Sequence, residues 1–293
     1  MEKLIVVLGA TGTGKSRLSI DLAARFPPDT FEVINADKMQ LYKGLNVTTN
    51  KVTAAERRLV PHHLLGDLDS RHGDVSPAEF RRLAAHVVSD VLSRGKVPVL
   101  VGGSNSFIHA LLVDRFEPGV DVFDGEVEES SELRYDCCFL WLDVAFPTLS
   151  PYLLRRVEEM LDSGMFRELA EFHGQNRAVQ TGLGKSIGVA EFSRYFKEYA
   201  AAEEEVRRGA YKEAVRNTQK NTWQLAKRQM GKIGRLRKAG WDLKRMDATE
   251  AFKAMGMTSD DDEDSGGKRW SEIWEEEVVG PSVKIVKRFL EEE

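Results

Sequence analysis

The stretch LGATGTGKSRLSIDLA, residues 8–23, carries the spacing Gly-x-x-x-x-Gly-Lys-Ser directly after the apolar run Leu4–Val7. This spacing predicts a strand, a glycine-rich loop and a helix whose first backbone N–H groups point at phosphate oxygens. In such a loop the lysine reaches a terminal phosphate and the hydroxyl ligates Mg²⁺, so Mg²⁺ is the expected cofactor. The residues expected to bind phosphate are Gly9, Gly12, Thr13, Gly14, Lys15 and Ser16, with Ser16 also the Mg²⁺ ligand. The loop predicts that a polyphosphate is bound. It does not distinguish transfer of a phosphoryl group from departure of diphosphate as a leaving group.

Strands and helices alternate in the first half of the chain, and helices dominate the second half. This alternation predicts an α/β fold, a P-loop-containing parallel sheet flanked by helices, with a smaller helical domain. The expected strands cover residues 3–9, 31–37, 97–101 and 135–144. The expected helices cover residues 15–26, 77–94, 149–163, 165–173, 189–199, about 203–238 and 281–293.

The change in pattern predicts three parts. Residues 1–145 form the P-loop α/β core, residues 146–256 a mainly helical domain that covers the substrate, and residues 257–293 an acidic loop and a C-terminal helix. The acidic run 260–264 and the Ser-Gly-Gly that follows it predict a solvated, disordered loop.

Composition excludes several classes. The chain has 293 residues and a formal charge of −5, so it is not built overall to coat nucleic acid. Its two cysteines, Cys137 and Cys138, are adjacent and cannot form a disulfide framework. No apolar run reaches the roughly 18 residues of a membrane span, and the histidines show no metal-binding spacing. We expect no membrane association and no structural metal.

Polar side chains follow the expected strands. Asp37 comes at the end of the second strand, in INADKMQLY, and should face the same crevice as the phosphate-binding loop. It either accepts a proton from an acceptor substrate or caps its own turn. Asn35, two residues earlier, is a candidate nucleotide ligand. Ser104 and Asn105 start a helix after Gly102-Gly103, and they either contact the nucleotide or cap that helix.

Eight basic residues and no acidic one lie between residues 214 and 241. The run is either a solvated helix face or a basic lip over an anionic ligand. On the second interpretation the nucleotide-binding residues are Lys220, Lys227 and Arg228.

Three classes fit these features: a small-molecule kinase, an enzyme that releases diphosphate, and a nucleotide-binding regulatory module. The stretches GATGTGKSRLSIDLA, INADKMQLYKGLNVTTNKV, PHHLLGDLD, VGGSNSFIHALL, GKSIGVAEF and NTWQLAKRQMGKIGRLR follow one another in the order found in isopentenyltransferases, which transfer dimethylallyl groups to adenine. VPHHLLG, GGSNSFI and PSVKIVKRFL most resemble the plant adenylate isopentenyltransferases of cytokinin biosynthesis. The resemblance covers nearly the whole chain and favours release of diphosphate over phosphoryl transfer.

The resemblance implies roles for named residues. Asp37 takes the proton from the adenine N6 amine, and Thr11 supports the reacting centre. Lys185 binds the departing diphosphate, where many relatives have Arg. Arg156 matches an Arg on the first helix of the helical domain and is also expected to bind diphosphate. A single ammonium in place of the guanidinium fork changes the geometry of the diphosphate contact.

The resemblance also bears on partners. The substrates are dimethylallyl diphosphate and an adenine nucleotide, with ATP or ADP favoured over AMP because more phosphates engage the basic cluster. No tRNA is expected, since the acidic stretch 117–134 would repel a phosphate backbone; a kinase and a tRNA dimethylallyltransferase remain the alternatives. We expect a monomer, in the plastid, with a transit peptide not present in this chain, or in the cytoplasm.

Overall fold

The computed structural model describes residues 1–293 except 121, 124–129, 176–179, 257–262 and 293. Within the described residues, the strands form one parallel sheet in the order β3-β2-β4-β1-β5-β6. They are β1 (Lys3–Gly9), β2 (Phe31–Asn35), β3 (His62–His63), β4 (Val97–Gly102), β5 (Asp136–Asp143) and β6 (Leu243–Asp247).

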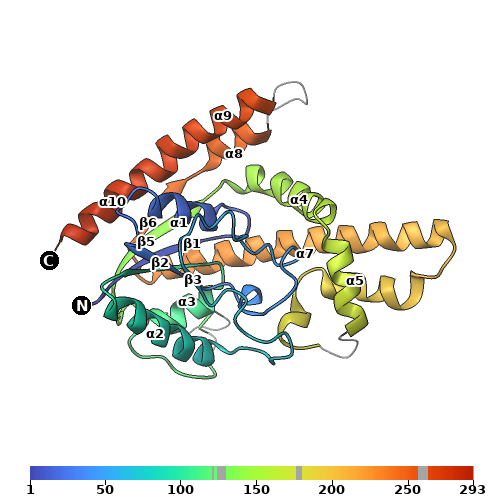
Figure 1. The fold of residues 1–293 in the computed structure, drawn as a ribbon, viewed down its shortest axis with the longest axis horizontal. Helices are drawn as coiled ribbons and strands as arrows, with labels where there is room; N and C mark the ends of the chain where they lie inside the picture. The colour runs from blue at the N-terminus through green and yellow to red at the C-terminus, as the bar shows by residue number, and fades with distance from the viewer. Residues whose placement is uncertain (121, 124–129, 176–179, 257–262, 293) are drawn as a thin grey trace.

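Helices cover both faces of the sheet and extend beyond it as an arm (Figure 1). The α-helices are α1 (Lys15–Ala23), α2 (Pro77–Ser93), α3 (Asn105–Leu112), α4 (Phe146–Asp162), α5 (Met165–Gln175), α6 (Val189–Arg194), α7 (Glu204–Lys238), α8 (Thr249–Gly256), α9 (Glu263–Trp274) and α10 (Gly280–Glu291). Short helical turns are η1 (Met39–Leu41), η2 (Gly182–Lys185), η3 (Tyr195–Tyr199) and η4 (Glu275–Val279).

The central strand β1 places the site. Its residues alternate between two hydrophobic cores: Leu4, Val6 and Leu8 pack on the side of α2, α3 and α7, whereas Ile5 and Val7 pack on the side of α1, α4 and the C-terminal helices. The chain continues from β1 through α1 to β2 on one side, while β5 pairs with β1 on the other. The carboxyl end of β1 is therefore the topological switch point, where ligands bind in open parallel sheets.

The expected α/β fold and its four inner strands are confirmed. Two strands were missed. β6 lies inside the range assigned to the helical domain. It is an edge strand whose sequence LKRMD buries only Met246, so it shows no alternation of apolar and polar residues that would predict a strand. β3 is a two-residue edge strand, too short to leave a pattern.

The C-terminal part differs from the expected loop and single helix. Residues 263–267 belong to α9, which continues through the π-helical turn η4 into α10, so Glu263 to Glu291 is helical throughout. The rest of the expected acidic loop, 260–262, lies outside the described residues, as do several acids of the 117–134 stretch. In the part of the chain that the structure describes, no helix has the length and apolar character needed to cross a bilayer.

Candidate active site

The phosphate-binding loop joins β1 to α1, as the sequence predicts. Gly12 and Gly14 adopt φ of 82° and 92°, values that favour glycine, and Gly14 is the N-cap of α1. A Cβ on Gly9 would lie 2.4 Å from the carbonyl oxygen of Leu142 on β5, so the close approach of the strands requires glycine there. The buried Thr13 hydroxyl donates to the Ala10 carbonyl at 3.0 Å, which assigns the Thr13 side chain to loop structure.

Lys15 and Ser16 begin α1 and differ in exposure. The half-buried ammonium of Lys15 donates to the Ala10 carbonyl at 2.6 Å, so it lies folded over its own loop. The pKa of Lys15 is lowered to about 8, mainly because the ammonium is buried; Asp37 opposes this shift and Arg156 adds to it. Ser16 is exposed at the first turn of the helix, an open position for its hydroxyl.

Thr11 is held from two sides. Its hydroxyl accepts a hydrogen bond from Nη1 of Arg156 on α4 at 3.2 Å, and its backbone N–H donates to Oε1 of Gln229 on α7 at 2.7 Å. The structure thus brings together Thr11 and Arg156, which the sequence analysis expected at one site. The Thr11 N–H is occupied by its hydrogen bond to Gln229.

Gln229 is the main residue that the sequence analysis missed. Its amide is buried and bridges two loops, since Nε2 also donates to the carbonyl oxygen of Gly103 at 2.9 Å. A Cβ on Gly103 would lie 2.5 Å from that Nε2, so the contact requires glycine. Gln229 stands in the quoted stretch NTWQLAKRQMGKIGRLR, where its amide among basic residues was the available signal.

Asp37 follows the end of β2 and is held in a turn by Asn35. The Asn35 carbonyl oxygen Oδ1 accepts from the Asp37 N–H at 3.1 Å, and Nδ2 donates to the Asp37 and Leu64 carbonyls. The Asp37 carboxylate accepts from the Met39 N–H at 3.1 Å. Asn35 is buried and occupied by these contacts, so it shapes the Asp37 turn instead of presenting an open amide to a nucleotide.

Asp37 and three cations form one electrostatic cluster. Desolvation raises the pKa of Asp37, while Lys15, the turn N–H groups and Arg156 lower it in part. Lys51 belongs to the same cluster: burial lowers its pKa to about 8, with Glu168 and Asp37 opposing. No role was predicted for Lys51, which stands in the stretch TTNKV. The arrangement is a carboxylate of raised basicity beside cations at a phosphate-binding loop.

The second glycine turn, after β4, packs against the Asp37 turn. A Cβ on Gly102 would lie 2.3 Å from the backbone of Ala36, and the Ser104 hydroxyl accepts from the Lys38 N–H at 3.0 Å. Asn105 is buried and donates through Nδ2 to the carbonyl oxygen of Gln229 at 3.3 Å. Ser104 and Asn105 thus brace the site internally.

Lys185 lies on the Asp37 side of the site, where its ion-pair partner is Asp74. It is exposed in η2 and pairs with Asp74 at 2.5 Å, and Lys38 is 3.9 Å from the same carboxylate. The pairing with Asp74 lowers the pKa of that carboxyl. Diphosphate at Lys185 would have to compete with Asp74.

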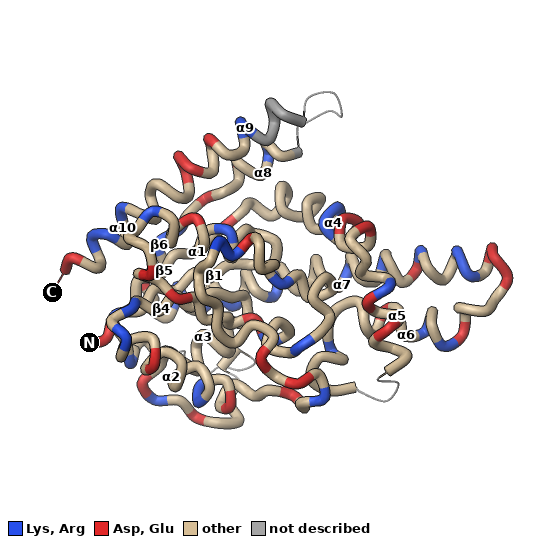
Figure 2. Tube along the Cα trace, viewed as in Figure 1, with Lys and Arg blue, Asp and Glu red and all other residues tan. Residues whose placement is uncertain are grey.

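The basic residues of the run on α7 are spread along the helix (Figure 2), and they include an exposed group and a group that contacts the core. Lys220, Lys227 and Arg228 are exposed, and the Lys227 ammonium lies 4.2 Å from the ring centre of Trp223, a cation–π distance. Further along, Lys232 contacts the Ser106 hydroxyl at 3.3 Å, and Arg235 donates to the carbonyls of Val122 and Phe123. The second group fastens α7 to the core.

The described residues offer few protein ligands for a metal ion. Among the described residues, no group of three or more His, Cys, Asp or Glu side chains gathers as a protein cage for a cation would. Mg²⁺ bound with a phosphate substrate needs only one or two protein oxygens, and the exposed hydroxyl of Ser16 suits that role.

Comparison with solved structures concerns the fold. A eukaryotic dimethylallyltransferase acting on tRNA superposes with a TM-score of 0.77 at 23% identity, covering 99% of this chain and 80% of that chain. A full-length tRNA isopentenylpyrophosphate transferase from Bacillus halodurans gives 0.70 at 21% identity, covering 100% of both chains.

Sequence comparison is more specific. The model of the family described as IPP transferase matches residues 40–133 and 119–233. An adenylate isopentenyltransferase from Humulus lupulus is 57% identical over 98% of this chain and 90% of its own length. Adenylate isopentenyltransferase 1, chloroplastic, from Arabidopsis thaliana is 52% identical over 99% of this chain and 81% of its own length. With its phosphate-binding loop, its Asp37 turn and these relatives, the chain belongs to the IPP transferase family.

Proposed function

We propose that this prenyltransferase moves a dimethylallyl group from dimethylallyl diphosphate to N6 of a free adenine nucleotide. The observation that carries the proposal is the cluster of Asp37, Lys15 and Arg156 at the phosphate-binding loop. A base of raised pKa beside cations suits a reaction in which a proton leaves one substrate and a diphosphate leaves the other. The relatives named adenylate isopentenyltransferase support an adenine nucleotide as acceptor.

In the proposed reaction, the N6 lone pair forms a bond to the allylic carbon of the donor. The bond from that carbon to the diphosphate oxygen breaks, and its electron pair leaves with the diphosphate. The N6 proton passes to the Asp37 carboxylate. A positioned base of this kind contributes about 10²-fold to 10⁴-fold in rate.

The donor side stabilises the leaving group. Lys15 would turn from the Ala10 carbonyl to a phosphate oxygen, since both are acceptors for the same ammonium. Arg156 already points at the Thr11 hydroxyl and would share its remaining N–H groups with diphosphate. Mg²⁺ held by Ser16 would neutralise part of the diphosphate charge. Lys185 is proposed to approach the diphosphate on its release.

The acceptor side favours ATP or ADP over AMP in this proposal. Lys220, Lys227 and Arg228 form an exposed basic group on α7, and a longer phosphate chain meets more of it. A free nucleotide is proposed in place of tRNA, and the product would enter cytokinin biosynthesis. The enzyme is proposed to act as a monomer.

The compartment is proposed to be the plastid. Several relatives carry chloroplastic names, and one at 41% identity is named mitochondrial. Imaging of a fluorescent fusion to the full-length gene product tests this point.

The function is tested by incubating the purified protein with dimethylallyl diphosphate and AMP, ADP, ATP or unmodified tRNA. Mass spectrometry should detect prenylated nucleotide and stoichiometric diphosphate, with higher kcat/KM for ATP or ADP. Formation of ADP from ATP without a prenylated product would indicate a kinase. Efficient modification of the tRNA would overturn the acceptor class.

A further inference from the structure

The C-terminal helical segment packs directly on the phosphate-binding loop. Trp274, the last residue of α9, is only 2% exposed. A Cβ on Gly14 would lie 2.9 Å from Cη2 and 3.4 Å from Cζ3 of the Trp274 ring. Gly14 is the N-cap of α1 in a left-handed conformation, so the indole edge occupies the space beside the last glycine of the loop. This contact joins the end of the chain to its phosphate-binding motif.

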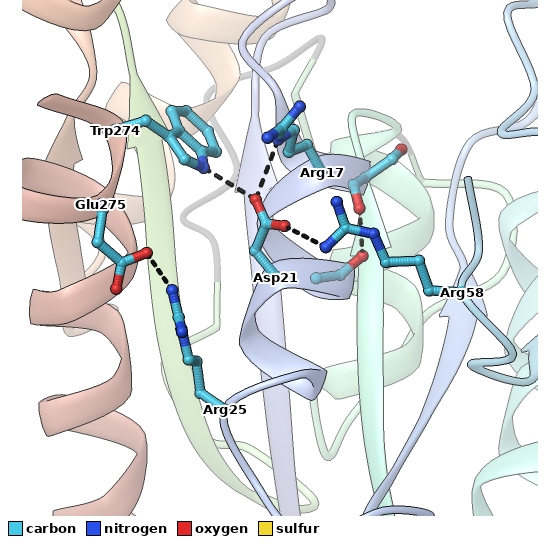
Figure 3. A network of polar contacts seen from close by, with 8 residues as sticks. Arg17, Asp21, Arg25, Arg58, Trp274 and Glu275 are labelled. Atoms are coloured by element: carbon cyan, nitrogen blue, oxygen red, sulfur yellow. Dashed lines mark hydrogen bonds and ion pairs between the residues drawn. The ribbon is translucent and has the colours of Figure 1, made fainter. Parts of the chain in front are cut away.

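A single carboxylate fixes the indole in place. Asp21 of α1 has a side chain 13% exposed, and it accepts hydrogen bonds from three donors (Figure 3). Nε1 of Trp274 and Nε of Arg17 lie 3.0 Å from Oδ2, and Nη1 of Arg58 lies 3.3 Å from Oδ1. Asp21 therefore links α1 to α9 and to the loop that contains Arg58.

Three further contacts extend the interface around α1. The Trp270 ring stacks on Trp274 with centroids 5.4 Å apart, and the Arg17 guanidinium lies 4.6 Å from the Trp270 ring centre. Just beyond the C-terminal end of α1, Arg25 pairs with Glu275 at 2.5 Å (Figure 3). Arg17 lies in the first turn of α1 and Asp21 in its last turn, so the contacts with Trp270 and Trp274 run along the helix, whereas the Arg25–Glu275 pair is peripheral and half-exposed.

We propose that Trp274, held by Asp21, is a positioning residue for the diphosphate of the donor. The phosphate site uses backbone N–H groups at the start of α1, and their directions depend on the conformation of Gly14. An indole packed against Gly14 holds that conformation before the ligand arrives, which lowers the ordering cost of binding. The contacts of Trp274 are with Gly14 and Asp21 and not with the Asp37 turn, so its loss weakens diphosphate binding and leaves the chemical step largely intact.

Identification of the ligand as a prenyl diphosphate rests on the proposed function, but diphosphate binding itself is measured without turnover. Calorimetric titration of the protein with inorganic diphosphate and Mg²⁺ gives Kd directly. Steady-state kinetics with dimethylallyl diphosphate and ATP give KM for each substrate and kcat.

Trp274→Phe removes the N–H donor and the distal ring atoms that reach Gly14. We expect Kd for diphosphate and KM for the donor to rise by about fivefold to thirtyfold, with kcat and KM for ATP within about twofold of wild type. Asp21→Ala should give the same pattern, and Asp21→Asn should restore part of the affinity because its amide oxygen still accepts from the indole. Glu275→Gln, which removes only the peripheral pair, should match wild type.

Several results would overturn the inference. One is a folded Trp274→Phe protein, checked by near-ultraviolet circular dichroism, that binds diphosphate with wild-type Kd. Another is an equal loss of donor and ATP affinity in Trp274→Phe. If Trp274→Phe weakens diphosphate binding but wild type forms no prenylated nucleotide, the positioning role stands and the proposed function fails.

Discussion

The donor side and the acceptor side of the site differ in how their polar groups are held. Around the phosphate-binding loop, Lys15, Thr11 and Thr13 bond to other groups of the chain, and Gln229 ties the loop to α7. On the outer part of α7 the basic side chains are exposed. In the proposed reaction, diphosphate would therefore be held mainly by backbone geometry and the nucleotide phosphates by exposed side chains.

This difference has an energetic consequence. Groups on the donor side are half-buried, so a charge there loses hydration and its effect is large. Exposed cations on α7 act through solvent and are screened by salt, so each contributes little. Substitutions should therefore have the largest effects at the buried cluster and the smallest on α7.

The largest effect is expected for Asp37→Asn. The amide keeps the shape of the side chain but does not take the N6 proton, so kcat should fall by about 10²-fold or more. Single-turnover kinetics on the purified variant measure the step, and Kd for diphosphate serves as the control because the loop is unchanged. Near-normal turnover would reduce Asp37 to a residue that organises its turn.

A smaller loss is expected for Gln229→Leu. It leaves the buried Thr11 N–H and the Gly103 carbonyl without partners, at about 1–3 kcal/mol, so kcat/KM should fall by about tenfold to a hundredfold. The same substitution at Gln219, a partly exposed residue of α7 whose amide contacts α4 and not the phosphate-binding loop, is the matched control. If both variants behave alike, the bridge to the loop has no part in catalysis.

The pH dependence of kcat/KM for the donor should be bell-shaped. Asp37 must be deprotonated, and its raised pKa places the acid limb above the ordinary carboxyl range. Lys15 must be protonated, so activity falls as pH rises through about 8, by about tenfold per pH unit.

Lys51 has a pKa of about 8 as well and could produce the same alkaline limb. Arginine stays protonated throughout this range, so an Arg at the responsible position removes the limb. We expect Lys15→Arg to shift the alkaline limb to higher pH and Lys51→Arg to leave it at the same pH. The reverse result would assign the essential proton to Lys51.

Local sequence patterns predicted the donor side well. The phosphate-binding loop, α1 and the inner strands carry short-range signals, and Asp37 follows from the rule that ligands bind at the carboxyl ends of parallel strands. Short-range signals do not report which distant residues meet. Thr11 and Gln229 are 218 residues apart in sequence, and Trp274 reaches a loop at the opposite end of the chain.

Edge elements and dual-purpose residues were also hard to predict. β6 buries one residue of five, so it leaves no apolar alternation. Asn35 and Asn105 have the chemistry of nucleotide ligands, yet burial directs their amides to backbone groups of the chain. Among the eight basic residues between positions 214 and 241, composition alone gave no means of separating those that fasten α7 to the core from those that stay exposed.

The smallest effect is expected for Lys220→Ala and Lys227→Ala, and it tests the acceptor side directly. An exposed ion pair contributes about 0.2–1 kcal/mol, so each variant should lower kcat/KM for ATP by only about 1.5-fold to fivefold. The value for AMP should change less, because a single phosphate reaches fewer of these cations.

Lys238→Ala is the matched control, since Lys238 is an exposed lysine on the same helix, about 27 Å from Lys220 along the axis. Raising the salt concentration should narrow the difference between ATP and AMP in wild type and should have little effect in the double variant Lys220→Ala/Lys227→Ala. An equal fall in kcat/KM for ATP and for AMP would mean that these lysines do not distinguish nucleotides by their number of phosphates. The nucleotide preference would then have to come from the buried side of the site.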